Sequence, residues 1–168
     1  MSKSGTIHLI CGPQGAGKPT LARELAAQQR AVRFSIDEWM TRLYAADQPP
    51  ALTLAWIGPR VQRCEAAIWE VCTQLVALGG QAVLDLGLLR RQDRARVLHL
   101  AWVAGIPVTL SVVEAEPALR RARVLERNHR RGNTSALDVT PAMFDFMERL
   151  YEAPDAAELA RAVQVVSR

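Results

Sequence analysis

The sequence predicts an α/β fold in which a mostly parallel sheet is covered by helices on both faces. Two patterns support this class: β-rich apolar runs alternate with helical segments along the whole chain, and those runs are continuous, as in strands that are buried on both faces. A chain of 168 residues is long enough for one domain with its own core. We therefore expect residues 1–168 to form a single domain.

The first half of the chain begins with an apolar run, residues 6–11, that ends at a glycine and is predicted to be a strand. Residues 17–30 place leucines and alanines on one side and charges on the other, which indicates a helix. Residues 31–36 form the second predicted strand, and residues 37–44 a short helical segment. After a proline-marked loop, a long helix is expected from about residue 60 to residue 78, where two glycines end it.

The second half repeats this alternation. Residues 81–86 and 106–113 are the third and fourth predicted strands, and a helix at residues 90–104 separates them. A Glu-Pro pair at residues 116–117 begins an arginine-rich helix, and Thr140-Pro141 supplies an N-cap and a first-turn proline for another. Residues 162–166 are a possible fifth strand. In such a fold, ligands bind at the carboxyl ends of the strands.

Positive charge is concentrated in one segment, although the chain as a whole carries a net charge of only +4. Residues 120–131 contain six arginines and one glutamate, so this segment carries +5 and the remainder −1. It lacks the interleaved aromatic residues of a platform that stacks single-stranded nucleic acid. We therefore favour a small anionic ligand, and expect nucleic acid to be an unlikely partner.

Cellular location and redox state are indicated only broadly. No apolar run approaches the length needed to span a bilayer, and the apolar stretch after the N-terminus is too short for a signal sequence, so we expect a cytoplasmic protein and no membrane partner. Cys11, Cys64 and Cys72 show no metal-binding spacing and are expected to be reduced core residues. The sequence leaves the oligomeric state open.

A phosphate-binding motif follows the first predicted strand directly. Gly12, Gly17 and Lys18 satisfy the pattern G-x-x-x-x-G-K, the Walker A motif, at a strand–loop–helix junction. Backbone N–H groups of such a loop surround phosphate oxygens, and the lysine neutralises the terminal phosphates. The predicted nucleotide-binding residues are Gly12, Pro13, Gln14, Gly15, Ala16, Gly17, Lys18, Pro19 and Thr20.

The motif has one defect, at Pro19. A serine or threonine normally follows the lysine, and its hydroxyl ligates Mg²⁺. Proline has no hydroxyl and removes one backbone N–H, although its fixed φ suits a first helical turn. Thr20 is a weak substitute ligand because it is rotated by about 100° around the helix. We therefore expect nucleotide binding with weakened metal coordination and slow turnover, unless water or an acid takes the vacant position.

With these motifs, the segment Phe34-Ser-Ile-Asp37, the segment Leu84-Asp-Leu-Gly87 and the arginine-rich helix, the chain resembles the P-loop small-molecule kinases. It is most similar to the AAA-33-type predicted ATP-binding kinases of bacteria, which are related to chloramphenicol phosphotransferases and zeta toxins. The resemblance implies a P-loop NTPase fold of three layers, α/β/α, with a five-stranded parallel sheet of order 2-3-1-4-5 and a helical lid at about residues 120–137. It also implies ATP as cofactor, with Mg²⁺, and phosphoryl transfer to a hydroxyl of a small molecule, a metabolite or an antibiotic.

Asp37 is the predicted catalytic base. It follows the second predicted strand, so its carboxylate should emerge near the phosphates, and in the related phosphotransferases an aspartate preceded by Ser-x accepts the proton of the acceptor hydroxyl. The alternative is that Asp37 only caps the next helix. Asp85 ends the third predicted strand and is expected to hold Mg²⁺ through water, or else to be a buried acid bonded to loop amides.

Three arginines of the basic helix, Arg120, Arg123 and Arg127, fall on one helical stripe. On a kinase lid, such guanidinium groups stabilise the transferring phosphoryl group and exclude water. Arg123 and Arg127 join Lys18 and Asp37 as catalytic candidates, and Arg120 is expected to stack on adenine. The alternative is a solvated basic helix.

The acceptor region is expected between the second and third strands, and its residues could stack on a ring or simply pack: Trp39, Met40, Tyr44, Trp56 and Ile57. Arg42, Arg60 and Arg63 in the same region leave a phosphorylated acceptor open. Residues 138–147 are interpreted as a structural helix with its apolar anchors. Two rivals to an active kinase remain: a nucleotide-binding protein weakened by Pro19, and a nucleic-acid end kinase.

Overall fold

The computed structural model describes residues 5–131 and 139–167. It contains one five-stranded parallel sheet of order β2-β3-β1-β4-β5, as the resemblance implied. The strands are β1 (Thr6–Cys11), β2 (Val32–Ser35), β3 (Gln81–Asp85), β4 (Val108–Glu114) and β5 (Ala162–Ser167). The predicted α/β class and the three-layer arrangement are confirmed.

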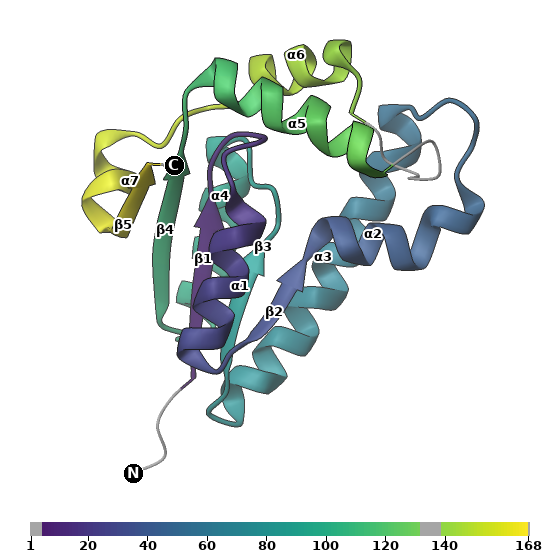
Figure 1. Ribbon diagram of the computed structural model, residues 1–168. Helices are drawn as coiled ribbons and strands as arrows, with labels where there is room; N and C mark the ends of the chain where they lie inside the picture. Colours follow the sequence, from purple (N-terminus) through teal and green to yellow (C-terminus); the bar gives the residue numbers. More distant parts are fainter. Residues whose placement is uncertain (1–4, 132–138, 168) are drawn as a thin grey trace.

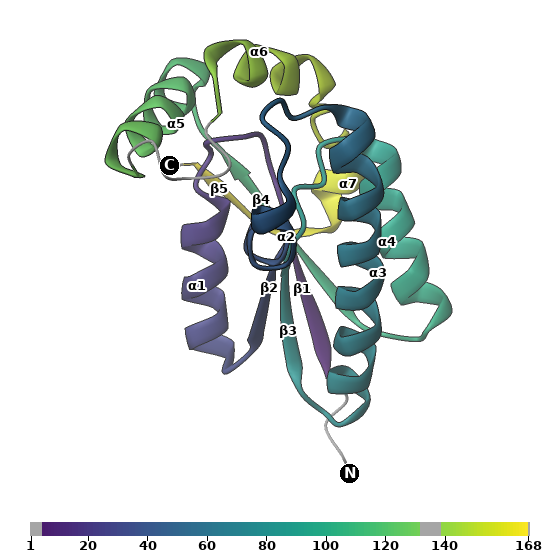
Figure 2. The same cartoon turned by 90° about the vertical axis from the view of Figure 1, so that its right-hand side faces the viewer.

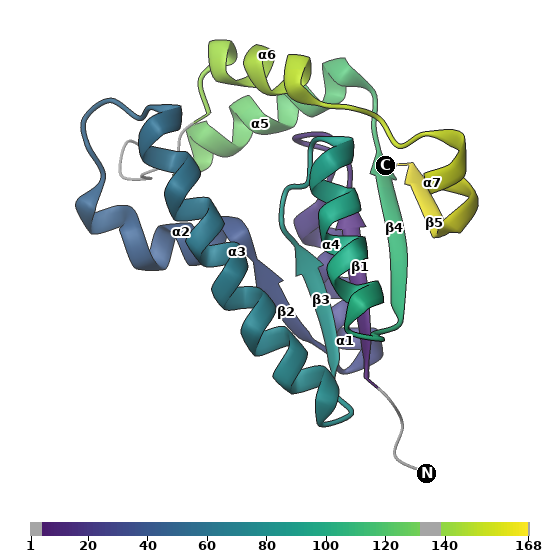
Figure 3. The same ribbon diagram turned by 180° about the vertical axis from the view of Figure 1, so that it is seen from behind.

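The helices lie on both faces of the sheet and across one end. α1 covers one face, and α3 and α4 cover the other (Figure 2). α5 and α6 extend across the carboxyl ends of the strands (Figures 1 and 3). The helices are α1 (Lys18–Gln29), α2 (Ile36–Tyr44), η1 (Ala45–Asp47), α3 (Leu54–Ala77), α4 (Arg91–Val103), α5 (Pro117–Arg131), α6 (Pro141–Leu150) and α7 (Ala156–Arg161).

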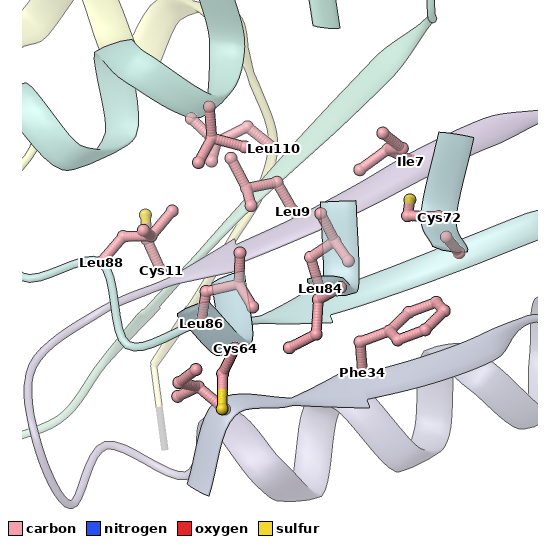
Figure 4. Close-up of a cluster of buried hydrophobic side chains, with 14 of the residues drawn as sticks. Ile7, Leu9, Cys11, Phe34, Cys64, Cys72, Leu84, Leu86, Leu88 and Leu110 are labelled. Atoms are coloured by element: carbon pink, nitrogen blue, oxygen red, sulfur yellow. The ribbon is translucent and has the colours of Figure 1, made fainter. Parts of the chain in front are cut away.

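The core is divided by the central strand β1, whose side chains alternate between the two faces. Ile7, Leu9 and Cys11 belong to the larger cluster, which packs beneath α3 and α4 (Figure 4). Ile10 belongs to the smaller cluster beneath α1. All three cysteines are buried and free, as expected. Burial of both faces explains why the strands are continuously apolar.

One helix prediction was wrong at its start, and one helix was missed. The long helix begins at Leu54 and not at about residue 60, because Thr53 caps it by accepting a hydrogen bond from the Trp56 N–H at 3.2 Å. Pro59 lies inside this helix near its N-terminus. The short helix α7 was missed, although Asp155 and Glu158 form a capping box at its start.

Candidate active site

The phosphate loop lies between β1 and α1, where two glycines have conformations and neighbours that exclude a side chain. Gly12 has φ +149°, and a Cβ there would lie 2.2 Å from the Val113 carbonyl oxygen. Gly15 has φ +77°, and a Cβ there would lie 2.6 Å from the carbonyl oxygen of Arg120. The loop therefore packs directly against β4 and the start of α5. This backbone shape presents N–H groups to an anion, so the loop fits nucleotide phosphates.

Lys18 is the first residue of α1 and is buried beneath the loop. Its Nζ donates to the carbonyl oxygens of Gly12 at 3.0 Å and Pro13 at 2.9 Å. Burial lowers the pKa of this lysine, and the charges of Asp85 and Asp37 act in the opposite direction. These contacts hold the cation at the centre of the loop, where the terminal phosphates of a nucleotide would lie.

Asp85 ends β3 beside the loop, in register with Ile10 of β1 and Ser35 of β2. Its carboxyl is buried, which raises its pKa to about 6 from the ordinary 3.8, while the Lys18 ammonium opposes that shift. Asp85 thus lies close enough to Lys18 to interact electrostatically.

Only some of the groups that usually coordinate Mg²⁺ in a phosphate-loop site are present. Pro19 is in the first turn of α1, as its fixed φ allows, and offers no ligand. Thr20 is exposed, which matches the expectation that its hydroxyl points away from the loop. In the described part of the chain, no group of three or more histidine, cysteine, aspartate or glutamate residues could hold a metal ion. Asp85 and Asp37 could orient the water shell of a metal, but the hydroxyl ligand is missing.

Asp37 lies in the first turn of α2 and is exposed on the wall of a large cavity. The alternative in which it caps the helix is wrong, because the N-cap is Ser35, whose hydroxyl accepts from the Glu38 N–H at 3.5 Å. Among the described residues, none forms a hydrogen bond or ion pair with the Asp37 carboxylate. This carboxylate is therefore available to a ligand.

The cavity has a volume of about 1500 Å³ and a mostly apolar lining. It lies between the phosphate loop, α2, α3, the loop between β3 and α4, and α6. Pro19 and Gln14 of the phosphate loop reach its wall, so the nucleotide and cavity sites adjoin at Asp37. Apolar residues from α3, the loop after β3 and α6 contribute to its lining: Ile57, Val61, Trp69, Leu86, Leu88, Leu89, Met143, Phe146, Met147 and Leu150.

Only part of the predicted acceptor region lines this cavity. Ile57 does, whereas Trp39, Tyr44 and Trp56 pack against the core. The Arg60 guanidinium lies over the Trp56 ring, 4.1 Å from its centroid, so these side chains form a packed cluster. The helix at residues 141–150, interpreted from sequence as structural, supplies the cavity roof instead.

Arg120 does not have the role expected from the sequence. Its side chain is 5% exposed and forms a double ion pair with Glu148 of α6, with distances of 2.5 and 2.7 Å. It also donates to the carbonyl oxygens of Gln14 at 3.2 Å and Ala115 at 2.9 Å. Adenine stacking is therefore excluded in this conformation, because the guanidinium is enclosed by protein. Arg120 instead ties the phosphate loop to α5 and α6.

The other two lid candidates, Arg123 and Arg127, do not both face the cavity. Arg127 reaches the cavity wall, whereas Arg123 is half-buried on α5 and is not part of that wall. α5 follows the predicted lid up to Arg131, and residues 132–137 of that prediction lie outside the described part of the chain.

One positioning residue was missed entirely. Arg94 is fully buried on α4, binds Glu158 through two nitrogens at 2.7 and 3.0 Å, and donates to the carbonyl oxygens of Leu89 and Glu152. It therefore ties the cavity loop after β3 to the C-terminal segment. Arg94 is one of three arginines in α4, and nothing in the sequence distinguishes it from Arg91 and Arg96.

A glycine loop with a buried lysine at the carboxyl edge of a parallel sheet defines the class: a P-loop nucleotide-binding fold. A family model for the AAA domain AAA_33 matches residues 7–154. The chain belongs to the AAA_33 family, and the resemblance inferred from its motifs is confirmed. In residues 5–131 and 139–167, no helix is long and apolar enough to cross a membrane.

Individual relatives include kinases. A shikimate kinase from Thioalkalivibrio sulfidiphilus is 26% identical over 173 residues, which cover 100% of this chain and 88% of that protein. A kinase candidate from Chloroflexus aurantiacus has a similar structure, with a TM-score of 0.77, 16% identity and coverage of 98% of this chain and 88% of the other. The Mycobacterium tuberculosis APS kinase in complex with AMPPNP and APS has a TM-score of 0.65, 15% identity and coverage of 98% and 88%. The structural likenesses support the predicted fold, and the shikimate kinase relative supports the predicted kinase class.

Proposed function

We propose that this protein is an ATP-dependent kinase that phosphorylates a hydroxyl of a small molecule bound in the cavity. One observation carries the proposal: the Asp37 carboxylate, which does not cap α2, lies where the cavity meets the phosphate loop. A nucleotide-binding loop alone would suit a sensor as well as an enzyme. An adjoining cavity with a free carboxylate at the junction is the arrangement that phosphoryl transfer requires.

In the proposed reaction, Lys18 and the loop amides hold the phosphates of ATP. Asp37 orients the acceptor hydroxyl and takes its proton as the oxygen attacks the γ-phosphorus. The new O–P bond forms while the bond from the γ-phosphorus to the bridging oxygen breaks, and ADP leaves. Arg127, and Arg123 after a movement of α5, stabilise charge on the transferring group. We assign α5 as the lid of this single domain.

Mg²⁺ is included in the proposal as the ion that enters with ATP. It would neutralise charge on the β- and γ-phosphates. Asp85 is the candidate to hold its water shell, and Pro19 provides no direct ligand. The ion is therefore expected to be held mainly by the nucleotide and water.

Pro19 favours a second candidate, a nucleotide-binding protein that transfers nothing. Calorimetric titration of ATP with and without Mg²⁺, followed by assay of ADP formation with hydroxylated acceptors, separates the two. ATP binding that Mg²⁺ strengthens, together with acceptor-dependent ADP formation, supports the kinase. ATP binding that is indifferent to Mg²⁺, without acceptor-dependent turnover, supports the second candidate. Absence of ATP binding contradicts both.

A further inference from the structure

The cavity is unlike a binding site for a compact polar acid. Its volume of about 1500 Å³ exceeds the roughly 300–1,000 Å³ of ordinary ligand pockets. Its lining extends along α3 from Leu54 to Trp69, a rise of about 22 Å along the helix. A single polar ring bound at Asp37 would leave most of this apolar surface in contact with water.

Two pairs of charged side chains in the cavity wall neutralise each other. Arg33 binds Glu38 at 2.5 Å, and Arg96 binds Glu65 at 2.5 Å. The Arg33 hydrogen bond holds the pKa of Glu38 below its usual range, which is consistent with a stable ion pair. Two of the six arginines in the wall are thereby neutralised, and the other four, which also line it, are Arg23, Arg42, Arg90 and Arg127.

Apolar side chains gather away from the phosphate loop. Phe146 and Met143 form part of the roof on α6, while Trp69 and Leu100 line the far end between α3 and α4. Asp37 and Pro19 lie at the opposite end. The cavity therefore has the Asp37 carboxylate beside the phosphate loop and a long body whose lining is mostly apolar, with the Arg96–Glu65 ion pair among its apolar side chains.

From this polarity we infer that the acceptor is an elongated, mainly apolar alcohol that presents its hydroxyl to Asp37 and buries an aromatic-sized body under α6. This inference rests on the proposed function and specifies its substrate class. It differs from what the names of the shikimate kinase and APS kinase relatives would suggest, because burial of the acceptor against the mostly apolar lining would supply most of its affinity.

The test uses the full chain saturated with AMPPNP and calorimetric titration of three probes: 4-biphenylmethanol, benzyl alcohol and shikimate. We expect 4-biphenylmethanol to bind at least about 10-fold more tightly than shikimate, and Phe146→Gln to weaken it about 10-fold. Leu119→Gln is the matched control, because Leu119 is 41% exposed on α5 and lies outside the cavity lining. This control should leave all affinities unchanged.

A second variant tests the length of the site without disturbing the core. Leu100 is 36% exposed at the far end, so Leu100→Gln should preserve the fold, weaken 4-biphenylmethanol and leave the shorter benzyl alcohol unchanged. Tighter binding of shikimate than of 4-biphenylmethanol, or indifference of the long probe to both variants, would overturn the inference. Failure of AMPPNP to bind would instead contradict the proposed function, and the same probe series on nucleotide-free protein would still decide what the cavity accepts.

Discussion

The phosphate loop occupies nine consecutive residues, 12–20, whereas the cavity is lined by side chains that range from Gln14 to Leu150. Backbone conformation determines the first region, since Gly12 and Gly15 need positive φ and close packing. Tertiary placement determines the second, since α3, α6 and the loop after β3 meet only in the fold. The nucleotide site is therefore local and the acceptor site is assembled, so mutations should affect them separately.

Asp37→Asn, at the junction of the two regions, should have the largest effect. Loss of the base should lower kcat about 1,000-fold, while the affinities for ATP and acceptor change little. Steady-state kinetics and calorimetry measure the two quantities. Asp47→Asn is the control because Asp47 is an exposed aspartate of η1. An unchanged kcat would remove Asp37 from the reaction.

Glu148→Gln tests the connection between the regions. It leaves the buried Arg120 guanidinium without its carboxylate, so the free energy of unfolding should fall by about 3 kcal/mol. The neighbouring pair of Arg121 and Asp145 is 43% and 47% exposed, so Asp145→Asn should cost no more than about 0.5 kcal/mol. Urea denaturation compares the variants, and equal effects would show that the buried pair has no special role.

Lys18→Met tests whether the nucleotide site is independent. ATP affinity should fall about 100-fold, equivalent to about 2.7 kcal/mol, because the central cation of the loop is lost. Binding of 4-biphenylmethanol without nucleotide should not change. Arg161→Met removes an exposed cation from α7 and is the calorimetric control. Equal losses for ATP and alcohol would contradict the separation of the two regions.

Asp85→Asn tests how much the buried Asp85 carboxylate, beside the phosphate loop, destabilises the fold. The pKa of Asp85 is raised, so the native state binds its proton more tightly than the unfolded chain does, and this group lowers stability as pH rises from about 4 to about 6. Between pH 4 and pH 6, the free energy of unfolding of the variant should therefore rise by about 2 kcal/mol relative to that of the wild type. Asp155→Asn should instead lower the free energy of unfolding, because the pKa of Asp155 is lowered and its ionised carboxylate stabilises the native state. Thermal denaturation at successive pH values would contradict the account if the Asp85→Asn difference were constant.

Pro19→Ser should have the smallest effect. The ratio of the ATP affinity with Mg²⁺ to the ATP affinity without it should rise about 10-fold, or about 1.4 kcal/mol, when a hydroxyl follows Lys18. Pro19→Ala restores the backbone N–H without the hydroxyl and separates the two contributions. Equal Mg²⁺ dependence in both variants would show that the missing ligand is unimportant.

The difference between local and assembled regions also explains what the sequence could predict. Residues 12–18 specify the phosphate loop, and the apolar runs locate all five strands. The start of α3 was predicted too late because Pro59 lies inside the helix, and a proline normally marks a helix boundary. The roof formed by Phe146 and the burial of Arg120 could not be predicted, because both depend on contacts between segments distant along the chain.

The central claim is that the two regions meet at Asp37, and an experimental structure with AMPPNP and 4-biphenylmethanol tests it most directly. We predict that the alcohol oxygen lies within hydrogen-bond reach of the Asp37 carboxylate and faces the γ-phosphate, with the biphenyl under α6. An alcohol bound away from Asp37, or phosphates outside the loop at residues 12–20, would contradict the account.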